Sequence, residues 1–366
     1  MTISKTNPYL NSTLKKTKNG AKILILEDQA RGSNADPHPQ KAAENAQKAV
    51  PETNIDMMNR ITRDPSPKAT SSIQNYIIEK TIIFYDSYAL NFEKIAKEKD
   101  PPNAISISQS ISEFTLLQEI VNKQSLFYKI ATTKEKERLF WGTNEKNVDL
   151  NVPQAETYID ESLEAGKDQI NQSKSKLEAQ VAKMKEEKKI AVLTSVGNYA
   201  DDLAYMKEKY PDLRKYNKMF MPIEFEKNEG ENFLAGVKGV IGVGASKDDG
   251  TLKEFSSLGE HTVFTSVEPY SDQGDSGTSF TTPPVTSKVA ELINKGMTVD
   301  EAVAYLKNQG KKMKNEEGDT YTFLPPKLFS GKETYSKGIP KQYRPSTQLE
   351  SKKKENLLNS GESQQA

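Results

Sequence analysis

Cysteine is absent from this sequence of 366 residues. Its absence excludes a disulfide framework, thiolate catalysis and a zinc site with cysteine ligands, but it fits both the cytosol and export. Histidine is scarce, so a mechanism that needs an imidazole must use His38 or His261. No stretch is apolar over the length of a bilayer span, and we therefore expect no membrane-spanning segment.

An excess of charge of one sign is also missing. The 51 basic residues (Lys and Arg) balance 51 acidic ones, which gives a net charge of zero and argues against a nucleic acid as partner. Residues 1–8 contain no apolar core of signal-peptide length. We therefore expect the protein to be cytoplasmic, or exported without a classical signal peptide as a secreted effector.

The sequence contains several short, continuous apolar runs. They are typical of strands, most of them covered on both faces, and helical patterns lie between them at 38–46 and 71–98. The strand runs occupy residues 22–26, 104–108, 190–195 and 236–245. Strands that alternate with helices predict an α/β fold with a mainly parallel sheet.

The rest of the chain divides by composition. We predict a flexible arm at 1–20, one domain at 21–340 and a disordered polar tail at 341–366. A segment at about 111–188 interrupts the domain, and its apolar residues recur at heptad spacing at Leu163, Ile170, Leu177 and Met184. This pattern predicts a narrow helical hairpin, or a helix that pairs with a partner or a second copy.

The stretch Gly274–Val285 carries the strongest chemical signal. Its serines precede an apolar helical pattern with Pro283 in the first turn, which is how a helix begins. A serine there is near unpaired backbone N–H groups that can stabilise an oxyanion, although a simple N-cap gives the same pattern. We favour Ser279 over Ser276 as the nucleophile, because the proline spacing and the helical pattern begin from Ser279.

Three further polar positions lie earlier in the chain, at the end of a strand, at the start of a helix and at the end of a later strand. Glu27 and Asp28 end the first strand, His38 opens the next helix, and Asn198 follows Gly197 at the end of a later strand. Ligands in open α/β sheets bind beyond the carboxyl ends of the strands, where these side chains are expected.

This order of motifs resembles the subtilisin-like serine peptidases, the subtilases. The segment 277–283 matches the family signature Gly-Thr-Ser-x-x-x-Pro, and 240–259 matches the strand, turn and Phe-Ser-Ser-x-Gly stretch. Residues 195–198 match the segment that bears the oxyanion asparagine, and 104–108 match the strand that lines the substrate groove. The resemblance implies a three-layer, doubly wound fold, here with an inserted helical hairpin.

The resemblance also implies a serine endopeptidase. Ser279 would attack the peptide carbonyl, His38 would transfer its proton, and Asn198 would bind the oxyanion. An ungapped match puts Glu27 at the position of the third triad member, but the shorter Asp28 is the more usual partner of an imidazole. We favour Asp28 and keep Glu27 as the alternative, since a step of one residue at a strand end turns the side chain to the other face.

The remaining expectations concern ligands and partners. Ser108, Gln109 and Ser110 would border the backbone of a polypeptide substrate. We expect no cofactor and assign no metal site. Calcium sites are common in the family, so calcium stays open as an alternative, but no loop here matches one. The alternative function is a degraded subtilase-like protein that binds a protein partner through the helical insertion.

Overall fold

The computed structural model describes most of the chain. The described residues are 17–27, 38–59, 70–108, 111–145, 147–198, 231–253, 255–257, 261–267, 277–314, 318 and 320–329. The predicted arm and tail therefore lie almost entirely outside the described residues, as do Asp28, Gln109, Ser110 and Ser276.

An eight-stranded sheet forms the centre of the molecule, in the order β2-β1-β3-β6-β7-β8-β10-β9. All neighbouring strands are parallel except β9, which runs antiparallel to β10. The strands are β1 (Lys22–Glu27), β2 (Asn54–Asn59), β3 (Ala104–Ile107), β6 (Ala191–Ser195), β7 (Ile241–Ser246), β8 (Thr262–Val267), β9 (Lys311–Lys314) and β10 (Thr320–Leu324).

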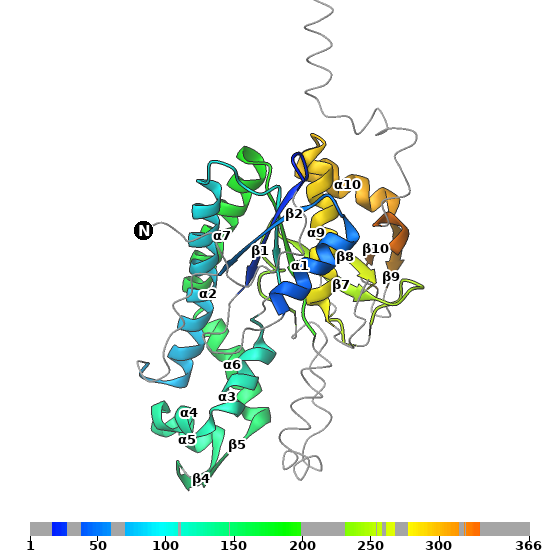
Figure 1. Cartoon of the computed structure of the whole chain (residues 1–366). Helices are drawn as coiled ribbons and strands as arrows, with labels where there is room; N and C mark the ends of the chain where they lie inside the picture. Colours follow the sequence, from blue (N-terminus) through cyan, green and yellow to red (C-terminus); the bar gives the residue numbers. More distant parts are fainter. Residues whose placement is uncertain are drawn as a thin grey trace, which may run out of the picture.

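Helices cover both faces of this sheet, which confirms the predicted α/β fold (Figure 1). One face carries α1 (His38–Ala49), α9 (Thr278–Asn294) and α10 (Val299–Gln309). The other face carries α2 (Ile73–Ala96) and α7 (Lys167–Glu187). The short helix η3 (Pro326–Leu328) follows β10.

Strand β1 shows how the sequence divides its side chains between the two faces. Ile23 and Ile25 belong to the core under α1 and α9, whereas Leu24 and Leu26 belong to the core under α2 and α7. Because side chains alternate along a strand, Glu27 lies on the face of α1 and α9. This alternation decides which carboxylate enters the site described below.

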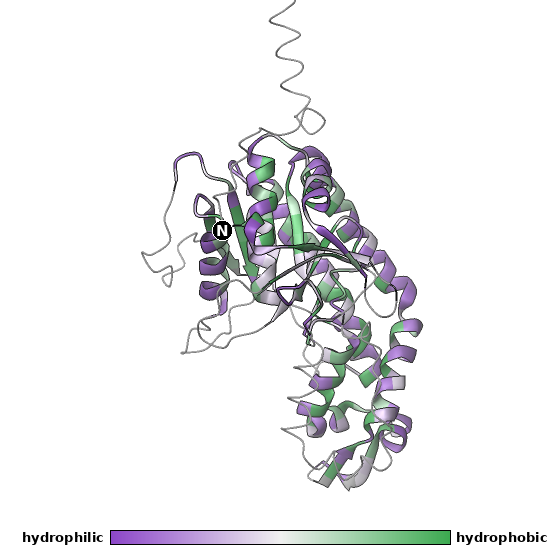
Figure 2. Cartoon of the chain, turned by 90° about the vertical axis from the view of Figure 1, so that its right-hand side faces the viewer, coloured by the Kyte–Doolittle hydropathy of each residue, from purple (hydrophilic) through white to green (hydrophobic). Residues whose placement is uncertain are grey.

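The inserted segment contains more helices and strands than the predicted hairpin. It contains α3 (Glu113–Asn122), α4 (Gln124–Ile130), α5 (Thr133–Leu139), the antiparallel pair β4 (Phe140–Asn144) and β5 (Asn147–Leu150), and α6 (Val152–Ala165), before α7. Capping boxes at Ser112 and Thr132 start two of the short helices, a local signal that a heptad pattern does not contain. In Figure 2 this lobe extends away from the sheet and shows apolar and polar residues along its helices.

The heptad stripe of α7 packs within the chain. Ile170, Leu177, Val181 and Met184 are buried in the core that α7 shares with α2. These four side chains therefore pack against α2 and are not exposed to a partner helix. Within the described residues, no helix combines the length and apolar content that a membrane crossing requires.

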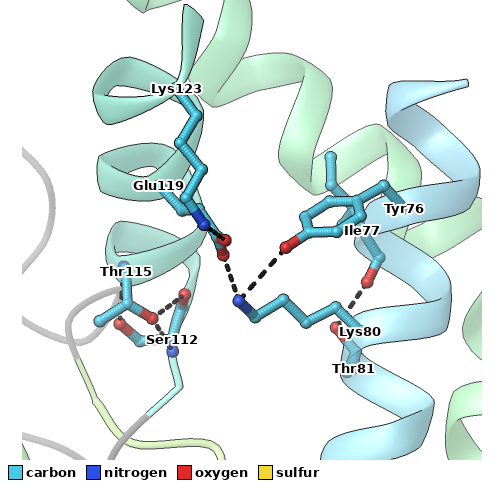
Figure 3. Close-up of polar contacts among 8 residues, drawn as sticks. All are labelled: Tyr76, Ile77, Lys80, Thr81, Ser112, Thr115, Glu119 and Lys123. Carbon is cyan, nitrogen blue, oxygen red and sulfur yellow. Dashed lines mark hydrogen bonds and ion pairs between the residues drawn. The ribbon is translucent and has the colours of Figure 1, made fainter. Parts of the chain in front are cut away.

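A charged cluster joins α3 to α2 at the base of the insertion. Figure 3 shows Glu119 of α3 between Lys80 of α2 and Lys123, with the Tyr76 hydroxyl 3.4 Å from the Lys80 amine. Burial alone would raise the pKa of Glu119, but the two lysines outweigh it and hold that pKa below its ordinary value. Glu119 is therefore held as a carboxylate.

Replacing Leu177 by alanine should destabilise the protein by about 2–5 kcal/mol, because a buried side chain would leave a cavity. The control is Leu90→Ala on α2, since Leu90 is 42% exposed and should cost far less. Chemical denaturation measures both, and size-exclusion chromatography should show no change in oligomeric state. A change in oligomeric state with unchanged stability would show that the stripe serves a partner.

Replacing Glu119 by glutamine should lower stability at neutral pH, because Lys80 would lose its carboxylate. A depressed carboxyl pKa stabilises the folded state above the ordinary value of about 4.3, and that contribution is lost as the pH falls through the folded-state pKa. The difference between wild type and variant should therefore shrink below about pH 4. Glu164→Gln, in an exposed pair with Lys167, is the control and should show no such difference.

Candidate active site

The polar residues that the sequence places in order come together at the carboxyl end of the sheet. Glu27 ends β1, His38 is the first residue of α1, Asn198 follows β6, and Ser279 lies in the first turn of α9. These elements meet because α1 and α9 pack on the same face of the sheet and share one apolar core.

A continuous chain of hydrogen bonds links three of these side chains. Glu27 Oε2 lies 3.0 Å from His38 Nδ1, and His38 Nε2 lies 2.8 Å from Ser279 Oγ. An ionised carboxylate only accepts, so the contact with Glu27 places the imidazole proton on Nδ1. The neutral ring then accepts the serine hydroxyl at Nε2, which is the arrangement that a base needs to activate an alcohol.

The carboxylate that contacts His38 is Glu27, the alternative in the sequence analysis. Asp28, which we favoured, lies outside the described residues. The regular alternation of β1 carries Glu27 to the face of α1 and α9, and no bulge is needed to bring a carboxylate to the imidazole. The Glu27 side chain is 5% exposed, and its second oxygen, Oε1, has no hydrogen-bond partner among the described residues.

An aromatic ring supports the imidazole. The Phe280 ring, next to Ser279 in the chain, lies 4.9 Å from the His38 ring between centroids, with the planes tilted by 45°. Phe280 is almost fully buried. It therefore limits rotation of His38 out of its two hydrogen bonds.

Asn198 is oriented by the first residue of α9. Its Oδ1 accepts hydrogen bonds from the backbone N–H of Thr278 at 2.7 Å and from the Thr278 hydroxyl at 3.0 Å. These donors fix the amide orientation and leave Nδ2 on the other side. The Thr278 hydroxyl also accepts the N–H of Gly197 at 3.3 Å, which ties the end of β6 to α9.

Gly277 borders the space between Asn198 and Ser279. A Cβ atom there would lie 2.8 Å from Asn198 Nδ2 and 3.3 Å from Ser279 Oγ, and the backbone φ of 155° already disfavours any side chain. The amide nitrogen and the hydroxyl thus face one small space. The backbone N–H of Ser279, in the first turn of α9, has no acceptor among the described residues.

Of the three predicted groove residues, only Ser108 is described. It directly follows β3, and its hydroxyl donates to the backbone carbonyl of Ser279 at 3.3 Å. The described residues contain no cluster of three or more metal-ligating side chains, and calcium binding stays untested.

Two contributors to this geometry, Thr278 and Phe280, were not predicted from the sequence. Both lie inside the Gly-Thr-Ser-Phe string that identified Ser279, so the signal was present. Their roles depend on contacts with His38 and Asn198, which come from distant parts of the chain and cannot be inferred from the string alone.

Comparisons with known proteins give matches in structure only. No family model and no curated protein sequence matches the chain. A lanthipeptide protease aligns at 9% identity and a TM-score of 0.43, over 86% of this chain and 88% of its own. The epidermin leader peptide processing serine protease from Staphylococcus aureus aligns at 13% identity and a TM-score of 0.42, over 88% of this chain and 76% of its own. MycP1 without its N-terminal propeptide aligns at 10% identity and a TM-score of 0.42, over 86% of this chain and 91% of its own.

Glu27→Gln keeps the shape of the side chain but removes the charge that orients and stabilises the imidazole. We expect the rate at which a fluorophosphonate modifies Ser279 to fall by roughly 10³–10⁴-fold. Asp28→Asn is the matched control and should change that rate little. The reverse result, with the large loss in Asp28→Asn, would show that the carboxylate is assigned to the wrong residue.

Proposed function

We propose that this protein is a serine peptidase that hydrolyses peptide bonds with Ser279 as nucleophile, His38 as base and Glu27 as the orienting carboxylate. The observation that carries the proposal is the unbroken hydrogen-bond chain from Glu27 Oε2 through both His38 nitrogens to Ser279 Oγ. Structural ion pairs of histidine are common, but a buried carboxylate, an imidazole and a serine hydroxyl in series are the parts of an acyl-transfer site.

The first half of the reaction follows from the positions of these groups. Ser279 Oγ attacks the substrate carbonyl carbon while its proton passes to His38 Nε2, and the resulting imidazolium is stabilised by Glu27. The new oxyanion receives hydrogen bonds from Asn198 Nδ2 and the Ser279 backbone N–H. One such donor is worth about 2.7–4 kcal/mol of transition-state stabilisation. The N-terminus of α9 adds a favourable dipole.

The second half reverses these proton transfers. His38 gives its proton to the leaving amine, the C–N bond breaks, and an acyl group stays on Ser279 Oγ. Water then loses a proton to His38 Nε2 and attacks the acyl carbon. The bond between the acyl carbon and Ser279 Oγ breaks as His38 returns that proton to Oγ, which restores the serine hydroxyl and releases the acid product. We place the substrate backbone beyond the carboxyl end of β3, beside Ser108, where an extended peptide pairs with the backbone that continues the strand.

A fluorophosphonate probe tests the proposal directly. We expect the wild-type protein to be labelled at Ser279 and to cleave an unstructured polypeptide, and Ser279→Ala to lose both activities. Ser276→Ala is the matched control and should keep both. Well-folded wild-type protein that neither reacts with the probe nor cleaves any peptide in a diverse library would refute the proposal and favour the degraded, partner-binding alternative.

A further inference from the structure

Helix α9 contains two prolines directly after its first turn, Pro283 and Pro284. Proline has no backbone N–H, and in a helix residue i donates to the carbonyl of residue i−4. Pro283 therefore removes the donor that the carbonyl of Ser279 would otherwise receive. The carbonyl of Ser279 therefore lacks the hydrogen bond that it would otherwise accept within the helix.

A side chain from the sheet supplies a replacement donor. Ser108 Oγ donates to the Ser279 carbonyl at 3.3 Å. The ladder between β3 and β1 ends with Ile107 paired to Leu26, and Ser108 and Glu27 are the residues that directly follow this last pair. The residue that anchors the nucleophile is thus adjacent to the one that orients its base. Ser279 is 8% exposed, which leaves little room for water to take the place of Ser108.

We propose that Ser108 is a positioning residue for Ser279, which it holds through the carbonyl that Pro283 leaves without its helical donor. This inference rests on the proposed peptidase function and changes the role expected for Ser108. A hydroxyl has one donor, and Ser108 uses that donor on Ser279, so its side chain has no O–H left to offer a bound substrate. Its contribution is to the geometry of the first turn of α9, which sets the direction of Ser279 Oγ.

The chain supplies a matched control on the same strand. Ser106 precedes Ser108 by two residues and therefore shares its face of the sheet. Ser106 is fully buried, and its hydroxyl has no hydrogen-bond partner among the described residues. Ser106→Ala and Ser108→Ala thus remove the same atom from neighbouring positions, and of the two only Ser108→Ala breaks a hydrogen bond with α9.

The first test is the steady-state kinetics of peptide cleavage. Ser108→Ala should lower kcat on the order of tenfold with little change in KM, because the hydrogen bond to the Ser279 carbonyl is lost and the nucleophile is misplaced. Ser108→Thr keeps the hydroxyl and should restore most of kcat, and Ser106→Ala should stay within about twofold of wild type. A rise in KM at constant kcat would overturn the proposal and make Ser108 a substrate contact.

The second test uses Pro283→Ala, which returns a backbone N–H to the Ser279 carbonyl. The midpoint of thermal unfolding should fall more for Ser108→Ala than for Ser106→Ala, and the loss should shrink in the Pro283→Ala background. Equal midpoints for the two serine variants would overturn the contact. If Pro283→Ala does not fold, the comparison of Ser108→Ala with Ser108→Thr decides.

The two tests also separate this inference from the proposed function. Wild-type protein without any cleavage or probe labelling refutes the peptidase function and, with it, the positioning role of Ser108. An active wild-type protein whose Ser108→Ala variant matches Ser106→Ala in both tests refutes the inference alone.

Discussion

The imidazole of His38 is held at both ring nitrogens, and each contact comes from a different layer of the molecule. Glu27 belongs to the sheet, whereas Ser279 belongs to the helix α9 that covers it. Contacts near 3 Å tolerate little movement, yet two hydrogen bonds cannot by themselves hold three elements together. The apolar core under α1 and α9, to which Ile23 and Ile25 of β1 contribute, sets these distances. Site geometry is therefore a consequence of packing on one face of the sheet.

The parts of the fold that could be predicted are those whose sequence carries a strong local pattern. Continuous apolar runs located β1, β6 and β7. Strand β2 was missed because it lies at the edge of the sheet and reads Asn-Ile-Asp-Met-Met-Asn. Strand β9 reads Lys-Lys-Met-Lys and is a strand only because β10 pairs with it, which no local pattern reveals.

The individual residues of the candidate site could be predicted from the sequence, but the contacts between them could not. Ser279, His38 and Asn198 stand out through their neighbours in the chain. The choice between Glu27 and Asp28 depends on the face to which each points, and the alternation of Ile23, Ile25 and Glu27 favours Glu27 without any appeal to side-chain length. The contacts of Phe280 and Ser108 join positions far apart in the sequence, so packing alone determines them.

The helix that carries Ser279 differs from an ordinary amphipathic helix, since all its residues from Thr278 to Ala290 are buried. A buried helix cannot leave its carbonyls to water, and Pro283 and Pro284 remove two of its own donors. Hydroxyls within α9 donate to carbonyls three or four residues earlier, from Thr281 and Thr282 to Thr278 and from Thr286 to Thr282. None of these reaches the carbonyl of Ser279: the residue four positions later is Pro283, and the hydroxyl three positions later, on Thr282, donates to Thr278 instead. The donor for that carbonyl has to come from outside the helix, and Ser108 at the end of β3 is placed to provide it.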